Sequence, residues 1–457
     1  MRCHTALAVA LIATGWTLLP GAGPAAAADP PVVTADFTQR LAPRPSMTGV
    51  LHSFSKVDPP DARIAPLRLG LVRGLPTSAP YRRGVSFGAR YTVVLSDLWG
   101  MPGSAVPWGG RGAPYADLAA WERFVERAAR QARGEDVVWD IWNEPDHPYF
   151  WQGTRAQYHD TFWVAERALR KVLGARAFVI GPSTAGYRPD WFGGLVDHCR
   201  TTGCRVDALS WHEFPGPGGS GIPPMDQHLR DTRRQFVDGL RGADVGVREL
   251  HVNESLPQND HLYPGEQLGT LALLEQHGAD ASARACWGPE GRSTCYDDTL
   301  DGLLTPKDTR SPARSFQPRA VWWATKRYAD GIGFRVRSTS SRSRLLAIAS
   351  RRAPDERTAT VVLAYAERRG VAHPGTPAAA QTDVRVRLRG LHRLPFVGRD
   401  RRVQVRIERI PATGAAALTR PHDRGTRTIT VRDGAADLTV AGVRLHETWV
   451  VRIKDAG

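Results

Sequence analysis

Short apolar runs recur along residues 49–332 and alternate with longer amphipathic stretches. This alternation is typical of βα units that share one parallel sheet. Eight such runs suit a closed barrel of parallel strands surrounded by helices. The runs are Gly49–Phe54, Leu67–Arg73, Tyr91–Asp97, Val137–Glu144, Phe178–Gly181, Ala208–His212, Val245–Glu254 and Ala281–Trp287. The sequence therefore predicts an α/β fold built on a (β/α)8 TIM barrel.

The stretches between these runs carry apolar residues at three- and four-residue spacing, which predicts helices. The first two βα units leave room for only a short helix each, because prolines interrupt residues 54–67 and 75–91. A helix at Ala320–Tyr328 closes the ring. The clearest helices between the runs are Ala116–Arg133, Ala156–Leu173, Gln227–Leu240 and Gly265–Gln276.

After Gly333 the pattern changes to period-two segments without a long helix, which predicts an all-β, antiparallel sandwich. The early segment Val32–Phe37 is also a predicted strand and a candidate for the same sheet. The later strands are Leu345–Ser350, Thr358–Ala366, Val384–Leu388, Val403–Ile410, Thr426–Val431 and Thr448–Ile453. We therefore expect a signal peptide at 1–28, an N-terminal segment at 29–48, the barrel at 49–332 and the sandwich at 333–457.

The first 28 residues have the pattern of an export signal. Arg2 opens it, an apolar run extends from Ala6 to Leu19, and the alanines at 25–28 offer a small-residue cleavage site. A membrane anchor is the alternative, but an anchor needs about 20 apolar residues and no such cleavage site. We expect a secreted, extracellular protein with no membrane span.

Four cysteines remain once Cys3 leaves with the signal, and they form two close pairs, Cys199 with Cys204 and Cys286 with Cys295. An even count in an exported chain predicts two short disulfide loops. Metal binding is the alternative, but neither pair has the C-x2-C spacing and no histidine cluster accompanies them. We expect disulfides and no metal.

The formal net charge of +15 comes almost entirely from arginine. A basic surface favours anionic partners such as a uronate-containing polysaccharide. Nucleic acid is disfavoured as a partner, because no basic stretch is interleaved with aromatic residues and no nucleic-acid motif occurs. An anionic polysaccharide is therefore one candidate partner.

The segment Val137–Asp146 carries the strongest chemical signal. Its apolar strand ends in Trp142-Asn143-Glu144-Pro145, which places Asn143 and Glu144 at the C-terminal mouth of the barrel, where barrel enzymes keep their chemistry. Desolvation of Glu144 by Trp142 favours the protonated carboxyl and suits a general acid. The alternative is a surface carboxylate that merely closes a strand.

A second apolar strand, Val245–Ser255, also ends in Asn-Glu. Glu249 lies in the middle of that strand, whereas Glu254 lies at its C-terminal end and faces the mouth. Glu254 is therefore the candidate nucleophile, and Glu249 is the candidate for a buried partner of an arginine. Glu144 and Glu254 are 110 residues apart, an interval that three βα units of roughly 35 residues fill. This interval places them on strands four and seven, and retaining glycosidases need two carboxyls about 5 to 5.5 Å apart.

A strand-four Trp-Asn-Glu-Pro with a strand-seven glutamate resembles the clan A glycoside hydrolases. The form Trp142-Asn143-Glu144-Pro145-Asp146 is most similar to family 39, the β-xylosidase and α-L-iduronidase group. The resemblance covers roughly residues 40–335, and a trailing β-sandwich also suits that family. It implies that Glu144 is the acid/base and that Glu254 is the nucleophile.

The same resemblance implies further roles around the sugar. Asn143 bonds the 2-hydroxyl, Arg73 lies near the nucleophile, His212 lines the sugar site, and Trp287 forms an aromatic floor. Each of the last three has a structural alternative. Arg73 could pair with a rim carboxylate, His212 could be a hydrogen-bonded core residue, and Trp287 could serve packing.

The expected function is a secreted retaining glycoside hydrolase that cleaves O-glycosidic bonds of a poly- or oligosaccharide by double displacement. No metal or organic cofactor is implied. Two alternatives use the same barrel, namely a secreted carbohydrate-binding protein without turnover and a transglycosidase. The sugar, its linkage and the choice between exo and endo action stay open.

Overall fold

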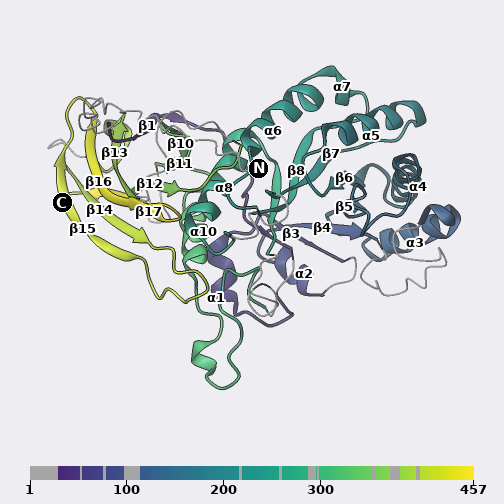
Figure 1. The fold of residues 1–457 in the computed structure, drawn as a ribbon, viewed down its shortest axis with the longest axis horizontal. Coiled ribbons are helices and arrows are strands. Elements are labelled where there is room, and N and C mark those ends of the chain that lie inside the picture. The colour runs from purple at the N-terminus through teal and green to yellow at the C-terminus, as the bar shows by residue number, and fades with distance from the viewer. Residues whose placement is uncertain are drawn as a thin grey trace, which may run out of the picture.

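In a computed structural model of the chain, a helix-covered barrel packs against a β-rich domain (Figure 1). The structure describes residues 29–51, 54–75, 79–96, 114–215, 219–256, 260–286, 295, 298–351, 357–370, 381–397 and 402–456. The export signal predicted at 1–28 lies outside these residues. Among the described residues, no helix is both long and apolar enough to cross a membrane.

The predicted eight-stranded barrel is confirmed. Neighbouring strands pair in parallel around the ring, and Val50 in the first strand pairs with Arg284 in the last to close it. The strands are β2 (Gly49–Val50), β3 (Leu71–Gly74), β4 (Arg90–Leu95), β5 (Val137–Ile141), β6 (Phe178–Thr184), β7 (Ala208–Glu213), β8 (Glu249–Ser255) and β9 (Ala281–Arg284). The predicted strands four and seven are therefore β5 and β8.

Helices cover the outside of the barrel, and those of the first two βα units are short, as the prolines predict. The helices are α1 (Asp61–Ile64), α2 (Ala79–Val85), α3 (Leu118–Gln131), α4 (Arg155–Leu173), α5 (Pro189–Thr202), α6 (Met225–Thr232), α7 (Leu240–Ala243), α8 (Pro264–His277) and α10 (Ala320–Ala329). One π-helical turn, Arg233–Val237, separates α6 from α7. The hydrogen-bonding period therefore changes within the single helix predicted at 227–240.

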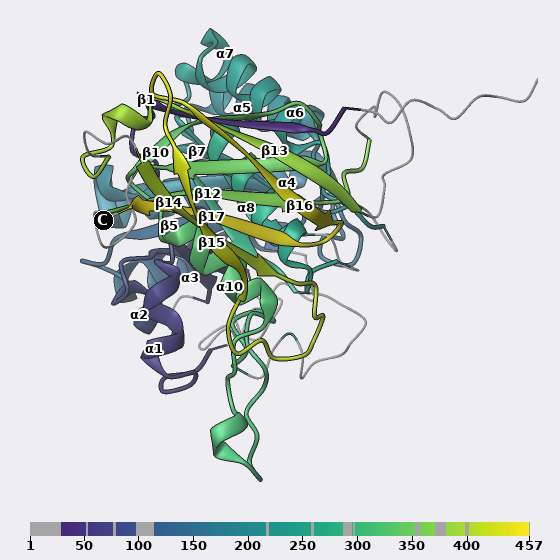
Figure 2. The ribbon, with the colours of Figure 1, turned by 90° about the vertical axis from the view of Figure 1, so that its left-hand side faces the viewer.

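The β-rich domain is one hydrogen-bonded sheet with the strand order β15-β14-β17-β12-β11-β10-β1-β13-β16 (Figure 2). Its strands are β1 (Val32–Arg40), β10 (Arg335–Ser340), β11 (Leu345–Ser350), β12 (Thr358–Tyr365), β13 (Gln381–Arg389), β14 (Arg402–Ile410), β15 (His422–Thr430), β16 (Ala436–Arg444) and β17 (Thr448–Asp455). The two edge strands approach each other, because Arg427 in β15 donates a hydrogen bond of 2.8 Å to Thr439 O in β16. The sheet is thus folded over a core of its own.

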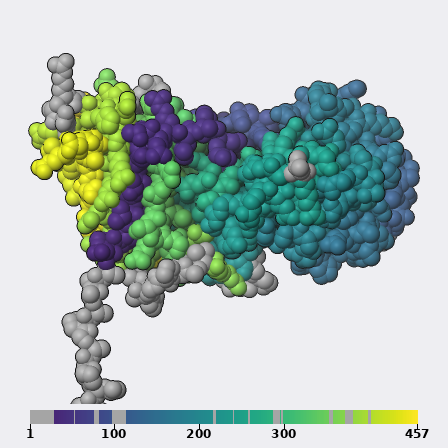
Figure 3. All heavy atoms as spheres, turned by 90° about the horizontal axis from the view of Figure 1, so that it is seen from above, coloured from purple at the N-terminus to yellow at the C-terminus, as the bar shows by residue number. Residues whose placement is uncertain are grey.

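Neighbouring strands after Gly333 pair antiparallel, as the sequence predicts, and the one parallel pair of the sheet involves the early strand β1. Strand β1 runs antiparallel to β10 but parallel to β13. The whole barrel separates β1 from the rest of its sheet along the chain, so no hairpin fixes the direction in which β1 enters. Figure 3 shows β1 in purple at the surface, across the C-terminal strands.

Helix α8 joins the two domains. Residues 264–275 of this helix are all buried, as expected of a helix that is enclosed on every side. Leu346, Val362 and Val450 from the sandwich belong to the same apolar cluster as Leu268 and Leu271 of α8. The sandwich is therefore packed into the barrel's own core, which holds the barrel strands in a fixed frame.

Candidate active site

The predicted site residues meet at the C-terminal mouth of the barrel. Arg73 lies in β3, His212 lies in β7 and Glu254 lies in β8. Asn143 and Glu144 follow Trp142, the first residue after β5. All five are buried or nearly so, and Glu144 is the most exposed, with 13% of its side chain accessible. Four separate strands thus contribute to one group of polar side chains.

The backbone is irregular where the site residues leave the strands. Trp142, Glu144 and Ser183 have φ of 74°, 47° and 50°, the left-handed region that side chains other than glycine rarely adopt. The Glu144 N–H donates to Ser183 O at 2.9 Å, which ties two of these residues together. Such strain costs about 1–3 kcal/mol per residue and gathers at functional sites, because only the surrounding structure holds it in place.

A β-bulge at Asn253 directs two consecutive side chains into the same space. Trp211 pairs with Val252 and His212 pairs with Glu254, so Asn253 is an extra residue in β8. Consecutive residues of a regular strand point to opposite faces. Here Asn253 Nδ2 donates to Asp140 and Glu254 accepts from Arg73, and these two partners also bond to each other. The bulge therefore directs both Asn253 and Glu254 into the barrel mouth.

Arg73 connects the two halves of the site. Its Nη1 donates to Glu254 Oε1 at 2.7 Å, and its Nη2 donates to Asn143 Oδ1 at 3.0 Å. Its Nε and Nη2 both donate to Asp140 Oδ2, at 2.9 and 2.8 Å. Burial alone would lower the pKa of Arg73, but the charges of Asp140 and Glu254 raise it, so the guanidinium stays charged. Because Asn143 Oδ1 is occupied, its amide nitrogen is the group left to meet a substrate hydroxyl.

Asp140 is a buried carboxylate that holds this cation in place. Its exposed fraction is 0%. Besides Arg73, it accepts hydrogen bonds from Ser183 Oγ at 2.5 Å and from Asn253 Nδ2 at 2.8 Å. Several donors on one buried carboxylate satisfy its charge and fix its orientation. Asp140 thereby fixes the direction in which Arg73 presents its remaining N–H groups.

The two candidate catalytic carboxylates lie side by side around His212. His212 Nδ1 is 2.7 Å from Glu144 Oε1 and 3.8 Å from Glu254 Oε2. One oxygen from each carboxylate and one nitrogen of the imidazole all lie within 4.8 Å of one another. A pair of carboxyls this close has the spacing at which one group can attack a sugar carbon while the other protonates the leaving oxygen.

The electrostatics of Glu144 differ from the expectation for a desolvated acid. Burial raises its pKa, but the hydrogen bond from His212 and the charges of His212, His147 and Arg73 together bring that pKa below its ordinary value. Burial lowers the pKa of His212, while the Glu254 charge and the bond to Glu144 raise it above its ordinary value. The proton of the pair is therefore held preferentially on His212.

The ring of Trp142 has defined partners in the structure. Its ring packs edge-on against Trp121 and Trp151, and its Nε1 donates to Phe150 O at 2.9 Å. The left-handed turn at residues 142–144 points the indole into the shell between the barrel and its helices.

Two other predicted residues have different outcomes. The sequence predicted Glu249 in the middle of its strand, but Glu249 is the first residue of β8. Its Oε2 lies 2.6 Å from Arg90 Nη1, so the predicted arginine partner is present, although the Glu249 side chain is 25% exposed and not buried. Trp287, the predicted aromatic floor, lies outside the described residues.

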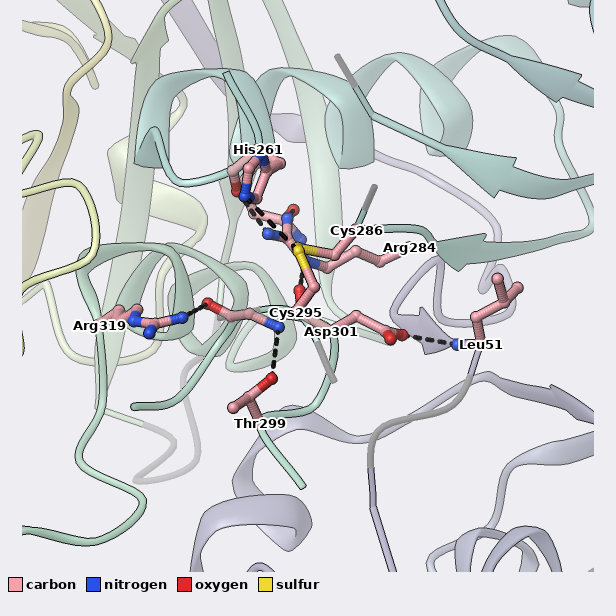
Figure 4. The surroundings of a disulfide bond; sticks show 10 residues. Leu51, His261, Arg284, Cys286, Cys295, Thr299, Asp301 and Arg319 are labelled. Atoms are coloured by element: carbon pink, nitrogen blue, oxygen red, sulfur yellow. Dashed lines mark hydrogen bonds between the residues drawn. A yellow bond between two sulfur atoms is a disulfide. The ribbon is translucent and has the colours of Figure 1, made fainter. Parts of the chain in front are cut away.

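Both predicted cysteine pairs form disulfides, Cys199–Cys204 and Cys286–Cys295. The second follows β9 and lies beside a buried network centred on Arg284 (Figure 4). Arg284 Nε donates to Asp301 O at 2.7 Å, and Leu51 N donates to Asp301 Oδ2 at 2.7 Å. The network thus ties the end of the last barrel strand to the end of the first.

Two clusters of described residues have ligand atoms close enough together for a metal ion. One consists of His261 with Cys286 and Cys295, whose sulfurs are joined in the disulfide. The other is the Glu144–His212–Glu254 group, where the guanidinium of Arg73 already lies 2.7 Å from Glu254. A cation at that position would face a fixed positive charge, which disfavours it.

Sequence reasoning assigned no role to Asp140, Ser183 or Asn253, although the structure places all three in the hydrogen-bond network of the site. Asp140 carried a readable signal, because a charged residue stands inside an otherwise apolar strand. Ser183 and Asn253 lie at register irregularities, which the hydrophobic pattern of a strand does not reveal.

A closed βα barrel with glutamates on strands four and seven defines the architecture of the clan A glycoside hydrolases that the sequence resembles. The family model described as glycosyl hydrolases family 39 matches residues 106–241, which include Glu144 and His212. A β-xylosidase from Caldicellulosiruptor saccharolyticus is 31% identical over 114 residues, which are 23% of this chain and 23% of that protein. The chain thus aligns with less than a quarter of the length of this curated relative. The predicted resemblance to family 39 is confirmed.

Solved structures match the fold over nearly the whole chain. The structure of N2152 from Neocallimastix frontalis has a TM-score of 0.71 at 18% identity and covers 94% of this chain and 100% of that chain. A GH39 enzyme from Xanthomonas axonopodis pv. citri has a TM-score of 0.64 at 16% identity, with 94% and 98% covered. A monomeric β-xylosidase from Caulobacter crescentus CB15 has a TM-score of 0.62 at 16% identity, with 93% and 100% covered. The barrel and the sandwich thus recur together in these structures.

Proposed function

We propose that this protein is a secreted retaining glycoside hydrolase that cleaves O-glycosidic bonds of an oligo- or polysaccharide. The observation that carries the proposal is the pair Glu144 and Glu254, whose carboxylate oxygens lie within 4.8 Å at the mouth of a closed barrel. The family match and the β-xylosidase relative support the same chemistry.

In the first step of this mechanism, Glu254 attacks the anomeric carbon and Glu144 protonates the leaving oxygen, which leaves a glycosyl ester on Glu254. Arg73 holds one oxygen of Glu254 at 2.7 Å and so fixes the carboxylate for attack. His212 contacts Glu144 Oε1 at 2.7 Å and so holds this carboxyl in position beside the leaving oxygen.

In the second step, Glu144 takes a proton from water, and the resulting hydroxide equivalent releases the sugar from Glu254 with its anomeric configuration retained. The lowered pKa of Glu144 suits this half of the reaction, since an ionised carboxylate is the base that the step needs. One residue thus acts as acid and then as base.

Secretion and a preference for acidic polymers are part of the same proposal. The pattern of residues 1–28 and the two disulfides support export, because disulfides persist in oxidising compartments. The net charge of +15 supports an anionic polysaccharide as substrate.

The test is turnover of a panel of aryl glycosides (xyloside, arabinofuranoside, glucoside, glucuronide and iduronide) by the wild type beside Glu144→Ala and Glu254→Ala. We expect one sugar to be hydrolysed, activity to disappear in Glu254→Ala, and azide to restore part of it in either variant by replacing the missing carboxylate. If the folded wild type hydrolyses none of the aryl glycosides and no polysaccharide, the proposal is contradicted.

A further inference from the structure

The two edge strands of the sandwich sheet leave a groove between them. Among the strands that the structure describes, β15 pairs with β14 alone and β16 pairs with β13 alone. The groove has a volume of about 250 Å³ and is lined by residues of β14, β15, β16 and β17. Its floor residues Ile407 and Trp449 belong to the core of the sandwich, whereas Val450, the next residue of β17, belongs to the cluster shared with the barrel. The groove therefore lies on the face of β17 that is turned away from the barrel, the side seen in Figure 2.

A β-bulge in β15 shapes one side of the groove. The register between β14 and β15 shifts between Arg406 and Glu408. Gly425, on β15 at this shift, has φ of 101°, which glycine adopts readily because it has no Cβ. A bulge bends its strand and changes the direction of the neighbouring side chains. Here the guanidinium carbon of Arg424 lies 5.9 Å from the centre of the Trp449 ring, within the range of a cation–π contact that holds it in place.

Two arginines, Arg424 and Arg427, are the ionisable side chains among the described residues that line this groove. Both are exposed, and neither forms an ion pair with a carboxylate of the described chain. The neighbouring Asp423 is paired with Arg406 instead, at 3.0 Å. Arg427 Nη2 donates to Thr439 O at 2.8 Å, which fixes this guanidinium across the gap. The groove thus presents two positioned positive charges that no acidic side chain in its lining offsets.

The size and polarity of the groove decide what fits it. Its volume is slightly below the about 300–1,000 Å³ of sites for drug-sized ligands, so it has room for a single sugar ring. Guanidinium groups bind a carboxylate through charge-assisted hydrogen bonds. The hydroxyls of Thr426 and Thr439, both exposed, can bond sugar hydroxyls. An unpaired strand edge also attracts another strand, but two like charges in the lining favour an anion.

We propose that this groove is a second saccharide-binding site, which takes an acidic sugar residue of a polysaccharide through Arg424 and Arg427. It binds the polymer on the face of the sandwich that is turned away from the barrel and takes no part in cleavage. The inference rests on the proposed function for the class of polymer, but it needs no turnover. Binding at the groove and hydrolysis at the barrel mouth can therefore fail separately.

The test measures binding of polygalacturonate to the full chain at about 0.15 M salt, where attraction to distant charges is screened. Neutral dextran is the reference polymer. We expect Arg424→Gln/Arg427→Gln to bind polygalacturonate about tenfold more weakly than the wild type, the scale of losing a charge-assisted hydrogen bond, with unchanged kcat/KM on the reactive aryl glycoside. Arg424→Gln alone keeps the bond from Arg427 to Thr439 and should show part of the loss.

Arg385→Gln/Arg393→Gln is the matched control, because it removes two exposed arginines of the same domain that lie outside the groove. It should bind polygalacturonate as the wild type does. An equal loss in this control, no loss in the groove variant, or a wild type that binds polygalacturonate no better than dextran would overturn the groove, whatever the aryl panel shows. If the panel shows no turnover but only the groove variant loses binding, the proposed function fails and the groove stands.

Discussion

Strand β8 carries one glutamate at each end, and the two have different surroundings. Glu249, at the start, places Oε2 2.6 Å from Arg90 and 2.8 Å from His251. Glu254, at the far end, places Oε1 2.7 Å from Arg73 and Oε2 3.8 Å from the imidazole that bonds Glu144. Both are paired with arginine, so an ion pair does not distinguish them. What distinguishes Glu254 is a second carboxylate beside it at the C-terminal mouth.

The difference teaches how one strand serves stability at one end and chemistry at the other. At the start of β8 the ring of Phe178 lies between Arg90 and Arg248, whose guanidinium carbons are 4.9 and 4.8 Å from its centroid. These groups close the bottom of the barrel. At the mouth, the carboxylates of Glu144 and Glu254 lie close together, and several residues have a left-handed backbone conformation. Both features cost stability, as expected of a catalytic site.

The largest expected effect is on kcat/KM, and it differs between variants of Glu254 and Glu249. Glu254→Gln should lower kcat/KM by about 10,000-fold or more, the scale on which loss of a nucleophile acts, because the amide cannot form the glycosyl ester. Glu249→Gln should leave kcat/KM within about threefold, because it touches no group of the mouth. Steady-state kinetics on the reactive aryl glycoside measures both. A large loss in Glu249→Gln with an unchanged fold would break the comparison.

Asp140→Asn tests whether Asp140 positions Arg73 at the barrel mouth. Loss of the charge that holds Arg73 should misplace the guanidinium and lower kcat/KM about 100-fold, as expected of small displacements at a reacting centre. Ser183→Ala removes only one donor to Asp140 and is the milder control. If Asp140 serves stability alone, the variant will melt at a lower temperature but retain wild-type kcat at a temperature where it is folded.

His212→Asn should lower kcat/KM about tenfold, the effect of losing one hydrogen bond, and should also change the pH profile. His212 lowers the pKa of Glu144 through its hydrogen bond and charge, so removing it raises that pKa. Glu144 then stays protonated to higher pH, and the alkaline limb of the kcat/KM profile should move to higher pH. A shift to lower pH, or none, would contradict the assignment of Glu144 as the acid.

The smallest effect concerns the other end of β8. Burial raises the pKa of Glu249, but His251 and Arg90 lower it to about 2 from an ordinary value of 4.5. A lowered pKa contributes stability above about pH 4.5 that is lost as the pH falls toward about 2. Glu249→Gln should therefore be less stable at pH 7 by about 2 kcal/mol and lose less stability on acidification than the wild type. Denaturant unfolding at several pH values checks this. If the free energy of unfolding falls with pH by the same amount in Glu249→Gln and in the wild type, the prediction is contradicted.

The sequence predicted the barrel well because each buried parallel strand is a short apolar run. Each of the eight runs overlaps a barrel strand, and the strand ends place Glu144 and Glu254 at the mouth. Strands β10 and β16 escaped detection for physical reasons. In β10 only Arg335 and Val336 are buried, and in β16 Gly442 interrupts the alternation of Leu438 and Val440. Helix α5 has two adjacent glycines, which weaken its helical pattern.

The details of the site were less predictable, because they arise from backbone irregularity. A regular β8 would point Asn253 away from Glu254, and only the bulge places both in the mouth. The end of β5 is irregular as well, because Trp142 and Glu144 both have a left-handed backbone that a strand pattern does not predict. The pKa of Glu144 depends on His212, a residue 68 positions away in the chain that the fold places at 2.7 Å.

The most direct test of the central claim is to trap the glycosyl ester. The wild type is incubated with a 2-deoxy-2-fluoro glycoside of the sugar that the panel identifies, carrying a reactive leaving group, and the digested protein is mapped by mass spectrometry. We predict one added sugar per chain, attached to Glu254 and absent from Glu254→Gln. A label on another carboxylate, or turnover with inversion and no label, would contradict the assignment of Glu254 as the nucleophile.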